Sequence, residues 1–129
     1  MKKIILSMAM ALCSLSLFAQ NQFLGEWKTI DDKTKEPAGI VNIYQGEDGL
    51  YYGKLVGTFG PDKSKVGTMI VKGMKYEDGK LVDGKIYDPE SGNTYFCTIK
   101  YDAAAKALNL RGSLDKRGLL GRSQTWLKE

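Results

Sequence analysis

Histidine is missing from the sequence altogether, and cysteine and proline are scarce. The lack of histidine excludes the commonest general base, the commonest zinc ligand and every nucleophile that depends on an imidazole. Only Cys97 lies outside the apolar N-terminal segment, so the remaining chain has no internal disulfide. Because Cys97 belongs to an apolar strand-like run, we expect a buried structural thiol. The sequence therefore gives us no catalytic residue, no metal site and no cofactor.

Long hydrophobic runs are also missing, with one exception at the N-terminus. The run Ile4–Phe18 follows two lysines and ends at the small residue Ala19. This pattern is typical of a cleavable secretory signal, and its 15 residues are short of the roughly 20 that cross a bilayer. We expect residues 1–19 to be a signal peptide, with an uncleaved anchor as the alternative. Residues 20–129 are then a single exported domain, located in the periplasm or secreted.

No sign of charge dominates the mature chain. Without the signal peptide, 17 lysines and arginines face 15 aspartates and glutamates, so the net charge falls from +4 to +2. The two signs alternate along the chain and form no basic block. This distribution gives no support to nucleic-acid binding, and the mature chain has no apolar run that could cross a membrane. We expect a monomer.

Glycine is plentiful and separates short runs that are rich in β-branched and aromatic residues. Helical periodicity is absent from the mature chain. The pattern predicts eight strands, at Leu24–Ile30, Gly39–Gln45, Leu50–Thr58, Thr68–Tyr76, Lys80–Asp88, Asn93–Asp102, Ala107–Ser113 and Leu119–Lys128. Short turns between successive strands predict an antiparallel up-and-down meander, and closure into an eight-stranded barrel hides its edges. The prolines are expected in the connections.

The least defined part of the prediction is residues 60–76. The loop Gly60–Gly67 is longer than the other connections and carries lysines. It is expected to be irregular. The apolar residues from Met69 to Met74 would also fit one helical turn, so the conformation of the whole segment stays open.

The first and last predicted strands each carry a tryptophan in a short motif, Gly25-x-Trp27 and Gly121-Arg122-x-x-x-Trp126. These strands are neighbours in a closed meander. Arg122 could then lie across the Trp27 ring as a cation–π pair and close one end of the barrel. We interpret Trp27, Arg122 and Trp126 as structural residues of barrel closure.

The segment from Gly84 to Tyr95 contains Asp88, Pro89, Ser91 and Gly92. Asp88 and Ser91 can accept hydrogen bonds from backbone N–H groups, Pro89 fixes φ, and Gly92 can take a positive φ. We interpret these four as a structural turn. The alternative is a carboxylate cluster of Asp83, Asp88 and Glu90 for acid–base chemistry or cation binding. An odd spacing between Asp83 and Asp88 argues against it, because it places them on opposite faces of a strand.

Tyrosine and arginine supply the candidate ligand contacts. Tyrosine has a polar tip on an apolar ring and suits a barrel interior or rim, although core packing is its default role. Arg111 faces outward if Leu108 and Leu110 face inward, and in the opposite register it is an internal anchor for an acidic group. With both registers open, we name as candidate ligand contacts Tyr52, Tyr87, Tyr95 and Arg111.

Together these motifs, with Gly49-x-Tyr51-Tyr52-Gly53-Lys54 and Leu110-Arg111-Gly112, resemble an uncharacterised bacterial family, domain of unknown function 2147. The resemblance covers nearly all of residues 23–129. An early Gly-x-Trp packed under a late Arg also resembles the lipocalin and calycin signature. The resemblance implies a small exported bacterial protein with a lipocalin-like barrel, and it implies no activity. Many members carry a cysteine pair in the middle loop, which this chain lacks.

The sequence thus predicts a non-catalytic barrel that binds a small apolar or amphiphilic molecule. Two alternatives remain. One is an interaction or structural protein of the cell envelope, which would use a rim of the barrel or the loop Gly60–Gly67. The other is a hydrolase or isomerase built on the carboxylates, so the question of enzymatic activity stays open.

Overall fold

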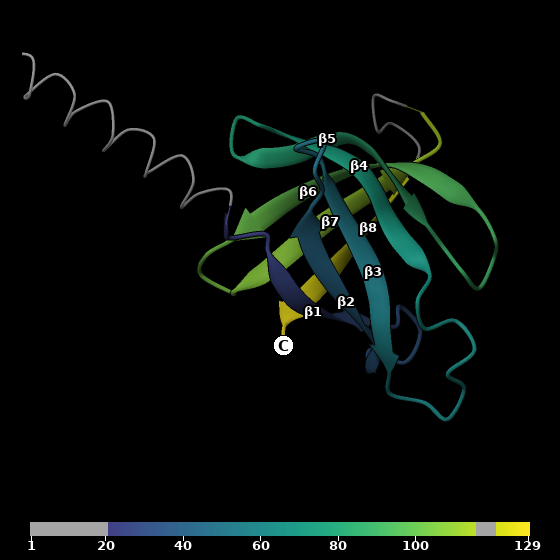
Figure 1. The fold of residues 1–129 in the computed structure, drawn as a ribbon. Helices are drawn as coiled ribbons and strands as arrows, with labels where there is room; N and C mark the ends of the chain where they lie inside the picture. Colours follow the sequence, from purple (N-terminus) through teal and green to yellow (C-terminus); the bar gives the residue numbers. More distant parts are fainter. Residues whose placement is uncertain (1–20, 116–120) are drawn as a thin grey trace, which may run out of the picture.

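The computed structural model describes residues 21–115 and 121–129. The predicted signal peptide lies outside the described residues, as do the first two residues of the predicted eighth strand. The strands are β1 (Gly25–Ile30), β2 (Pro37–Gln45), β3 (Tyr51–Thr58), β4 (Met69–Glu77), β5 (Lys80–Tyr87), β6 (Thr94–Asp102), β7 (Ala107–Ser113) and β8 (Gly121–Lys128). Each pairs antiparallel with its neighbour in sequence, and β1 pairs with β8 (Figure 1).

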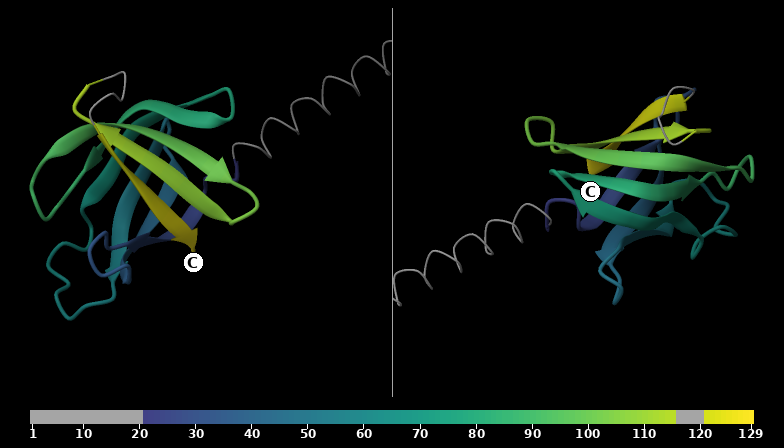
Figure 2. Two further views of the ribbon diagram at one scale, coloured as in Figure 1. Left: turned by 180° about the vertical axis from the view of Figure 1, so that it is seen from behind. Right: turned by 90° about the horizontal axis from the view of Figure 1, so that it is seen from above.

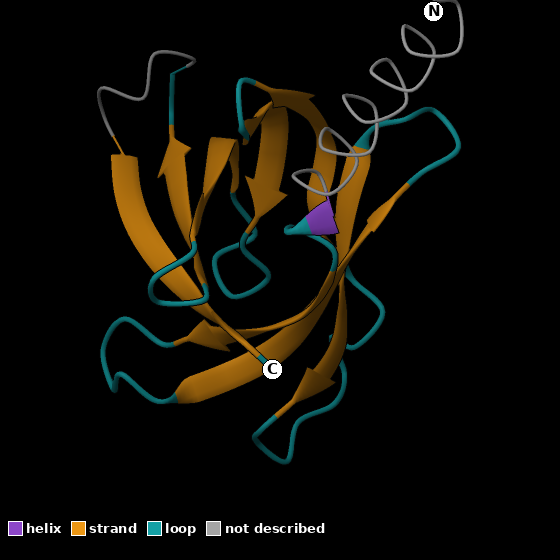
Figure 3. Ribbon diagram, turned by 90° about the vertical axis from the view of Figure 1, so that its left-hand side faces the viewer, coloured by secondary structure: helices purple, strands orange, loops and turns teal. Residues whose placement is uncertain are grey.

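The predicted fold, a closed up-and-down barrel of eight antiparallel strands, is confirmed. Two views of the ribbon show the strands wrapping around a common interior (Figure 2). Strand ends lie within two residues of the prediction wherever both are described. Apart from one short helical segment at its start, the described chain consists of strands and loops (Figure 3). Within it, no helix is long and apolar enough to cross a membrane.

Two details differ from the expectation. Pro37 is the first residue of β2 and is not in the connection, a position where a missing N–H costs no ladder bond. Residues 69–77 form β4, so the alternative of a helical turn there is wrong. The wide loop that precedes β4 is irregular as expected, and Lys63 fastens it by donating from Nζ to the carbonyl of Thr58.

The meander topology gives the barrel two different ends. The connections β1–β2, β3–β4, β5–β6 and β7–β8 lie at one end, which we call the mouth. The other connections and both ends of the barrel chain lie at the opposite end, which we call the closed end. Side chains alternate between the outer face and the interior along each strand, so register decides which residues line each end.

The closed end is filled by aromatic side chains. Phe23 precedes β1, is 1% exposed, and accepts a 3.0 Å hydrogen bond from Nε1 of Trp27 at its carbonyl oxygen. Its ring makes edge contacts with Tyr76 and Tyr101 at centroid distances of 6.3 and 6.4 Å. Trp27 packs against Tyr101 in the same manner at 6.4 Å. The interior is therefore plugged at this end.

The predicted contact between Arg122 and Trp27 is wrong. Trp27 is level with Lys128, whose Nζ lies 4.7 Å from the centre of a Trp27 ring and also donates to the carbonyl of Leu24. Arg122 is six residues away along β8, a distance of about 20 Å. Gly25 permits the lysine contact, because a Cβ at that position would lie 2.6 Å from the lysine nitrogen.

Candidate ligand-binding site at the barrel mouth

The register of β5 to β8 places the interior side chains in rows, and each row consists of residues that pair across neighbouring strands. The row nearest the closed end holds Tyr101, Leu108 and Trp126. The next holds Leu81, Ile99, Leu110 and Gln124. The third holds Gly84, Cys97, Gly112 and Arg122, and we call this row the shelf. Above it, at the mouth, Ile86 pairs with Tyr95.

The character of the rows changes at the shelf. Leu81, Ile99 and Leu110 below it are at most 2% exposed and close the interior with bulky apolar groups. The shelf itself consists of two glycines, one cysteine and one arginine. Three of the four shelf residues are small, and Arg122 is the one charged residue of this row.

The two shelf glycines differ in the space that surrounds them. A Cβ on Gly84 would lie 2.2 Å from Sδ of Met74 and 2.6 Å from the carbonyl oxygen of Lys72, so this site is full. A Cβ on Gly112 would lie 3.5 Å from Ile86 and 3.6 Å from Tyr95, which is ordinary contact. Gly112 is therefore the less crowded of the two shelf glycines, and it lies between Tyr95 on one side and Arg122 on the other.

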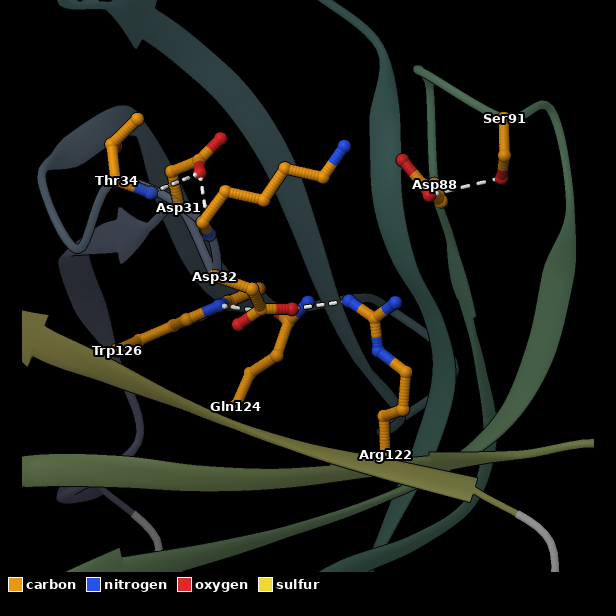
Figure 4. A network of polar contacts seen from close by, with 9 residues as sticks. Asp31, Asp32, Thr34, Asp88, Ser91, Arg122, Gln124 and Trp126 are labelled. Atoms are coloured by element: carbon orange, nitrogen blue, oxygen red, sulfur yellow. Dashed lines mark hydrogen bonds and ion pairs between the residues drawn. The ribbon is translucent and has the colours of Figure 1, made fainter.

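Arg122 projects into the mouth from β8 because it alternates in phase with the buried Trp126. Its guanidinium donates from Nη2 to Oδ2 of Asp32, in the β1–β2 connection (Figure 4). The two side chains are 75% and 39% exposed, so the pair is a solvated one.

Gln124 lies one step deeper on the same strand. Its Oε1 accepts a 3.4 Å hydrogen bond from Nε1 of Trp126. Its amide nitrogen is left as a donor without a partner among the described residues. Arg122 and Gln124 are therefore two hydrogen-bond donors on one strand, and Gln124 also lines the hollow at the seam between β1 and β8.

The β1–β2 connection holds Asp32 in position through its neighbour Asp31. Oδ1 of Asp31 accepts hydrogen bonds from the backbone N–H groups of Lys33 and Thr34, at 2.8 and 2.9 Å. These bonds stabilise the charged carboxylate and lower the pKa of Asp31. The turn is local, so the position of Asp32 does not depend on the barrel ladder.

The β5–β6 turn forms the opposite side of the mouth (Figure 4). Asp88 accepts from the backbone N–H of Glu90 at 3.0 Å and from the hydroxyl of Ser91 at 2.9 Å. Gly92 has the expected positive φ, at 78°. Lys65 fastens the β3–β4 loop to this turn by donating to the carbonyl of Pro89 at 2.7 Å.

The Asp88 carboxylate is thus engaged by hydrogen bonds inside the turn. Asp83 lies at a register shift of β5, with φ of 61°, and is exposed. Among the described residues, no three His, Cys, Asp or Glu side chains are grouped so that they could hold a metal ion.

The structure brings one of the four predicted ligand contacts into the mouth. Tyr95 faces inward, in phase with the buried Cys97 and Ile99. Tyr87 follows the inward Ile86, so the alternation directs it to the outer face.

Tyr52 and Arg111 correct the prediction, because both lie on the outer face. Tyr52 stacks on Tyr44 at 5.9 Å and donates its hydroxyl to Asp48. That hydrogen bond is the main cause of the raised pKa of Tyr52. Arg111 is exposed between the inward Leu110 and Gly112, and it contacts Oγ of Ser123 at 3.5 Å. A ligand inside the mouth would touch neither side chain.

Sequence reasoning missed the role of Gly112, Gln124 and Ile86, and it placed Arg122 at the wrong end. One signal could have found the two residues on β8. Trp126 is the strongest candidate for burial on that strand, and residues two and four positions before it share its face.

The barrel closes through a short seam between β1 and β8. Only Trp27 with Lys128 and Lys28 with Leu127 pair across it, whereas β7 and β8 pair along their whole length. Toward the mouth the two strands diverge, and a hollow of about 360 Å³ lies there, beside Ile30 and Thr125. Asp32 also lines this hollow, so its ion pair with Arg122 bridges the open part of the seam.

Comparison with known proteins identifies a family and a solved structure with a similar fold. A family model described as "Uncharacterized protein conserved in bacteria (DUF2147)" matches residues 25–128. A solved structure, protein HP1028 from Helicobacter pylori, is described as belonging to the lipocalin family. It is similar to this chain with a TM-score of 0.66 and 17% identity, over 83% of this chain and 82% of that one. At this identity the likeness shows the fold alone. No curated protein sequence matches the chain.

Proposed function

The chain belongs to the DUF2147 family of uncharacterised bacterial proteins, and from that premise we propose that it is an exported, non-catalytic binding protein for a small, partly apolar molecule. The observation that carries the proposal is the set of side chains around Gly112, where apolar and polar groups lie next to a residue that has no side chain of its own. Tyr95 and Ile86 offer an apolar wall, and Arg122 and Gln124 offer donors. Apolar walls with a few polar groups are typical of small-molecule sites.

The filled interior limits the size of the ligand. Below the shelf the barrel is occupied by buried side chains, and eight-stranded barrels have room for side chains or for one small ligand. A molecule bound here therefore lies in the mouth and does not reach the closed end.

The test compares a wall variant with a matched outer variant. Gly112→Val adds a branched side chain between Tyr95 and Arg122, whereas Asn109→Ala removes an exposed side chain from the outer face of the same strand. The neutral fluorescent probe N-phenyl-1-naphthylamine should bind the wild type and Asn109→Ala, and Gly112→Val should lose most of the signal. Circular dichroism would establish that each variant is folded. Equal binding by all three folded proteins would overturn a site at the mouth.

Export is part of the proposal and has its own test. The support is the N-terminal sequence, with its basic start and its apolar run before Ala19. Edman sequencing of the protein recovered from a periplasmic fraction should begin at Gln20. An intact N-terminus on cytoplasmic protein would contradict export.

A second candidate function is an envelope interaction protein, favoured by apolar side chains around the mouth. Phe59 and Val66 on the β3–β4 loop and Leu114 after β7 are 52%, 41% and 69% exposed. A photo-crosslinking residue in place of Phe59 should then give one discrete adduct in intact cells. If the only adducts are diffuse, or if the same residue in place of exposed Lys100 gives the same pattern, this function is contradicted.

A further inference from the structure

This inference rests on the proposed function and specifies its ligand. We propose that the ligand carries a carboxylate, which binds the guanidinium of Arg122 in place of the Asp32 carboxylate. Asp32 is in this sense an internal substitute for the acidic group of the ligand. The consequence is a site that prefers acids over neutral molecules with the same apolar body.

The environment of Arg122 suits an acidic ligand. The guanidinium has five N–H donors in a rigid fork, and its hydrogen bond to Asp32 uses one nitrogen, Nη2. Asp32 is its one ion-pair partner within residues 21–115 and 121–129. With the side chain 75% exposed, the remaining donors point toward space that a ligand can reach. Arginine forks match carboxylates by forming two parallel hydrogen bonds.

Asp32 already places a carboxylate against the guanidinium of Arg122. It lies on a connection that is held by the local Asp31 turn and not by strand pairing. The seam beside it is unpaired toward the mouth. Exposed ion pairs contribute little to stability, so a ligand acid can replace Asp32 without disturbing the barrel.

The residues next to Arg122 would border the apolar body of a bound acid. Gly112 pairs directly with Arg122 and adds no side chain to the interior. Beyond Gly112 the wall is Tyr95 with Ile86 beside it, two strands away from Arg122 at about 10 Å. A carboxylate on Arg122 therefore places an apolar body of roughly that length across Gly112 and against the tyrosine ring. A short-chain or aromatic carboxylic acid has these dimensions.

Three other charged side chains near the mouth are engaged by backbone or side-chain partners among the described residues. The Asp88 carboxylate is engaged by its own turn. Nζ of Lys65 is held by the carbonyl of Pro89, and Nζ of Lys63 by that of Thr58. Arg122, in contrast, is paired with a carboxylate that a ligand acid can replace.

The experiment measures the affinity of two matched probes, octanoate and octanol, by isothermal titration calorimetry at neutral pH. The wild type should bind octanoate more tightly. Arg122→Gln should lower the octanoate affinity by about tenfold or more, as expected for a charge-assisted bond, and leave octanol unchanged. Asp32→Asn should raise the octanoate affinity by about two- to fivefold, because the competitor is removed. Arg111→Gln, on the outer face of the adjacent strand, should change neither.

The outcomes separate this inference from the proposed function. Equal binding of octanoate and octanol, with no effect of Arg122→Gln, would overturn the acid preference and leave a site at the mouth intact. Binding of N-phenyl-1-naphthylamine that Gly112→Val abolishes, with no binding of octanoate, would also overturn this inference alone. If none of the three probes binds, both proposals fail.

Discussion

The closed end and the mouth of the barrel are built from the same eight strands, but their interiors hold different kinds of side chain. At the closed end Phe23 and Trp27 are each 1% exposed, and Tyr76 and Tyr101 pack against them. At the mouth, glycines and a cysteine lie beside an exposed ion pair. The boundary runs between the row of Leu81, Ile99 and Leu110 and the shelf above it.

This division separates stability from binding. Large buried aromatic rings contribute most of the free energy of a small core, and here they gather away from the mouth. Small and polar side chains contribute little to packing but leave space and donors. Changes at the closed end should therefore affect folding, whereas changes at the mouth should affect ligand affinity.

The largest expected effect is that of Trp27→Ala. Truncation of a buried tryptophan typically costs about 3–5 kcal/mol, and the variant also loses its hydrogen bond to Phe23. Urea unfolding followed by circular dichroism measures the free energy of unfolding. Tyr95→Ala at the mouth is the control and should lose less than half as much, because the ring is only partly buried. Equal losses would show that the two ends do not differ as described.

Next in size is the difference between the two shelf glycines. Gly84→Ala should destabilise the protein by about 1–3 kcal/mol, the usual range for overpacking, because the new methyl meets Met74 and the Lys72 carbonyl. Gly112→Ala should stay within about 0.5 kcal/mol of the wild type, since its Cβ has room. Thermal unfolding of both variants tests this. A comparable cost at Gly112 would mean that the mouth is as full as the core.

The thiol of Cys97, which lies on the shelf, can be used to measure whether water reaches this row. It is 4% exposed, and burial raises the pKa of its thiol to about 12 from a usual 9.0. Between these values the thiol ionises in the unfolded chain and stays neutral in the folded one. The free energy of unfolding should therefore fall as pH rises from 9 toward 12, by at most about 1.4 kcal/mol per pH unit.

The control is Cys97→Ala, in which the decline between pH 9 and 10 should flatten. Above pH 10 the buried Tyr51, whose pKa is also raised by burial, adds a decline of the same sign in both proteins. Native protein should react with a thiol reagent far more slowly than urea-unfolded protein. Rapid native labelling would show that water reaches the shelf.

The smallest expected effect on stability is that of Arg122→Gln. Its pair with Asp32 is exposed on both sides, and such pairs contribute about 0–1 kcal/mol. Thermal unfolding should show little change, in contrast to the loss of octanoate binding. A large destabilisation would mean that Arg122 holds the seam together and is a structural residue after all.

The fold could be predicted because its signals are local. Turn residues such as Pro89 and Gly92 mark where strands end, and runs of β-branched and aromatic residues mark the strands between them. With eight strands and short connections, closure follows from the need to hide edges.

The site was harder to predict because it depends on register. A shift of one residue moves every side chain to the other face. Tyr51 and Tyr52 are adjacent, and only the structure shows that Tyr51 is the buried one. The shift between Leu81 and Gly84 interrupts the alternation of β5. The predicted contact between Arg122 and Trp27 had both residues on the correct strands. It is wrong because the two residues lie at different positions along the barrel axis.

The seam between β1 and β8 also determines when the barrel can form. Its two residue pairs join Trp27 and Lys28 to Leu127 and Lys128, the longest sequence separation in the fold. Such contacts close a large loop and contribute late, because chain entropy must be overcome before they form. During folding the neighbouring hairpins can assemble one after another, while β1 can complete its pairing only when β8 is in place. Until β8 pairs with β1, both seam edges are open to pairing with other chains, and closure of this seam removes that route to aggregation.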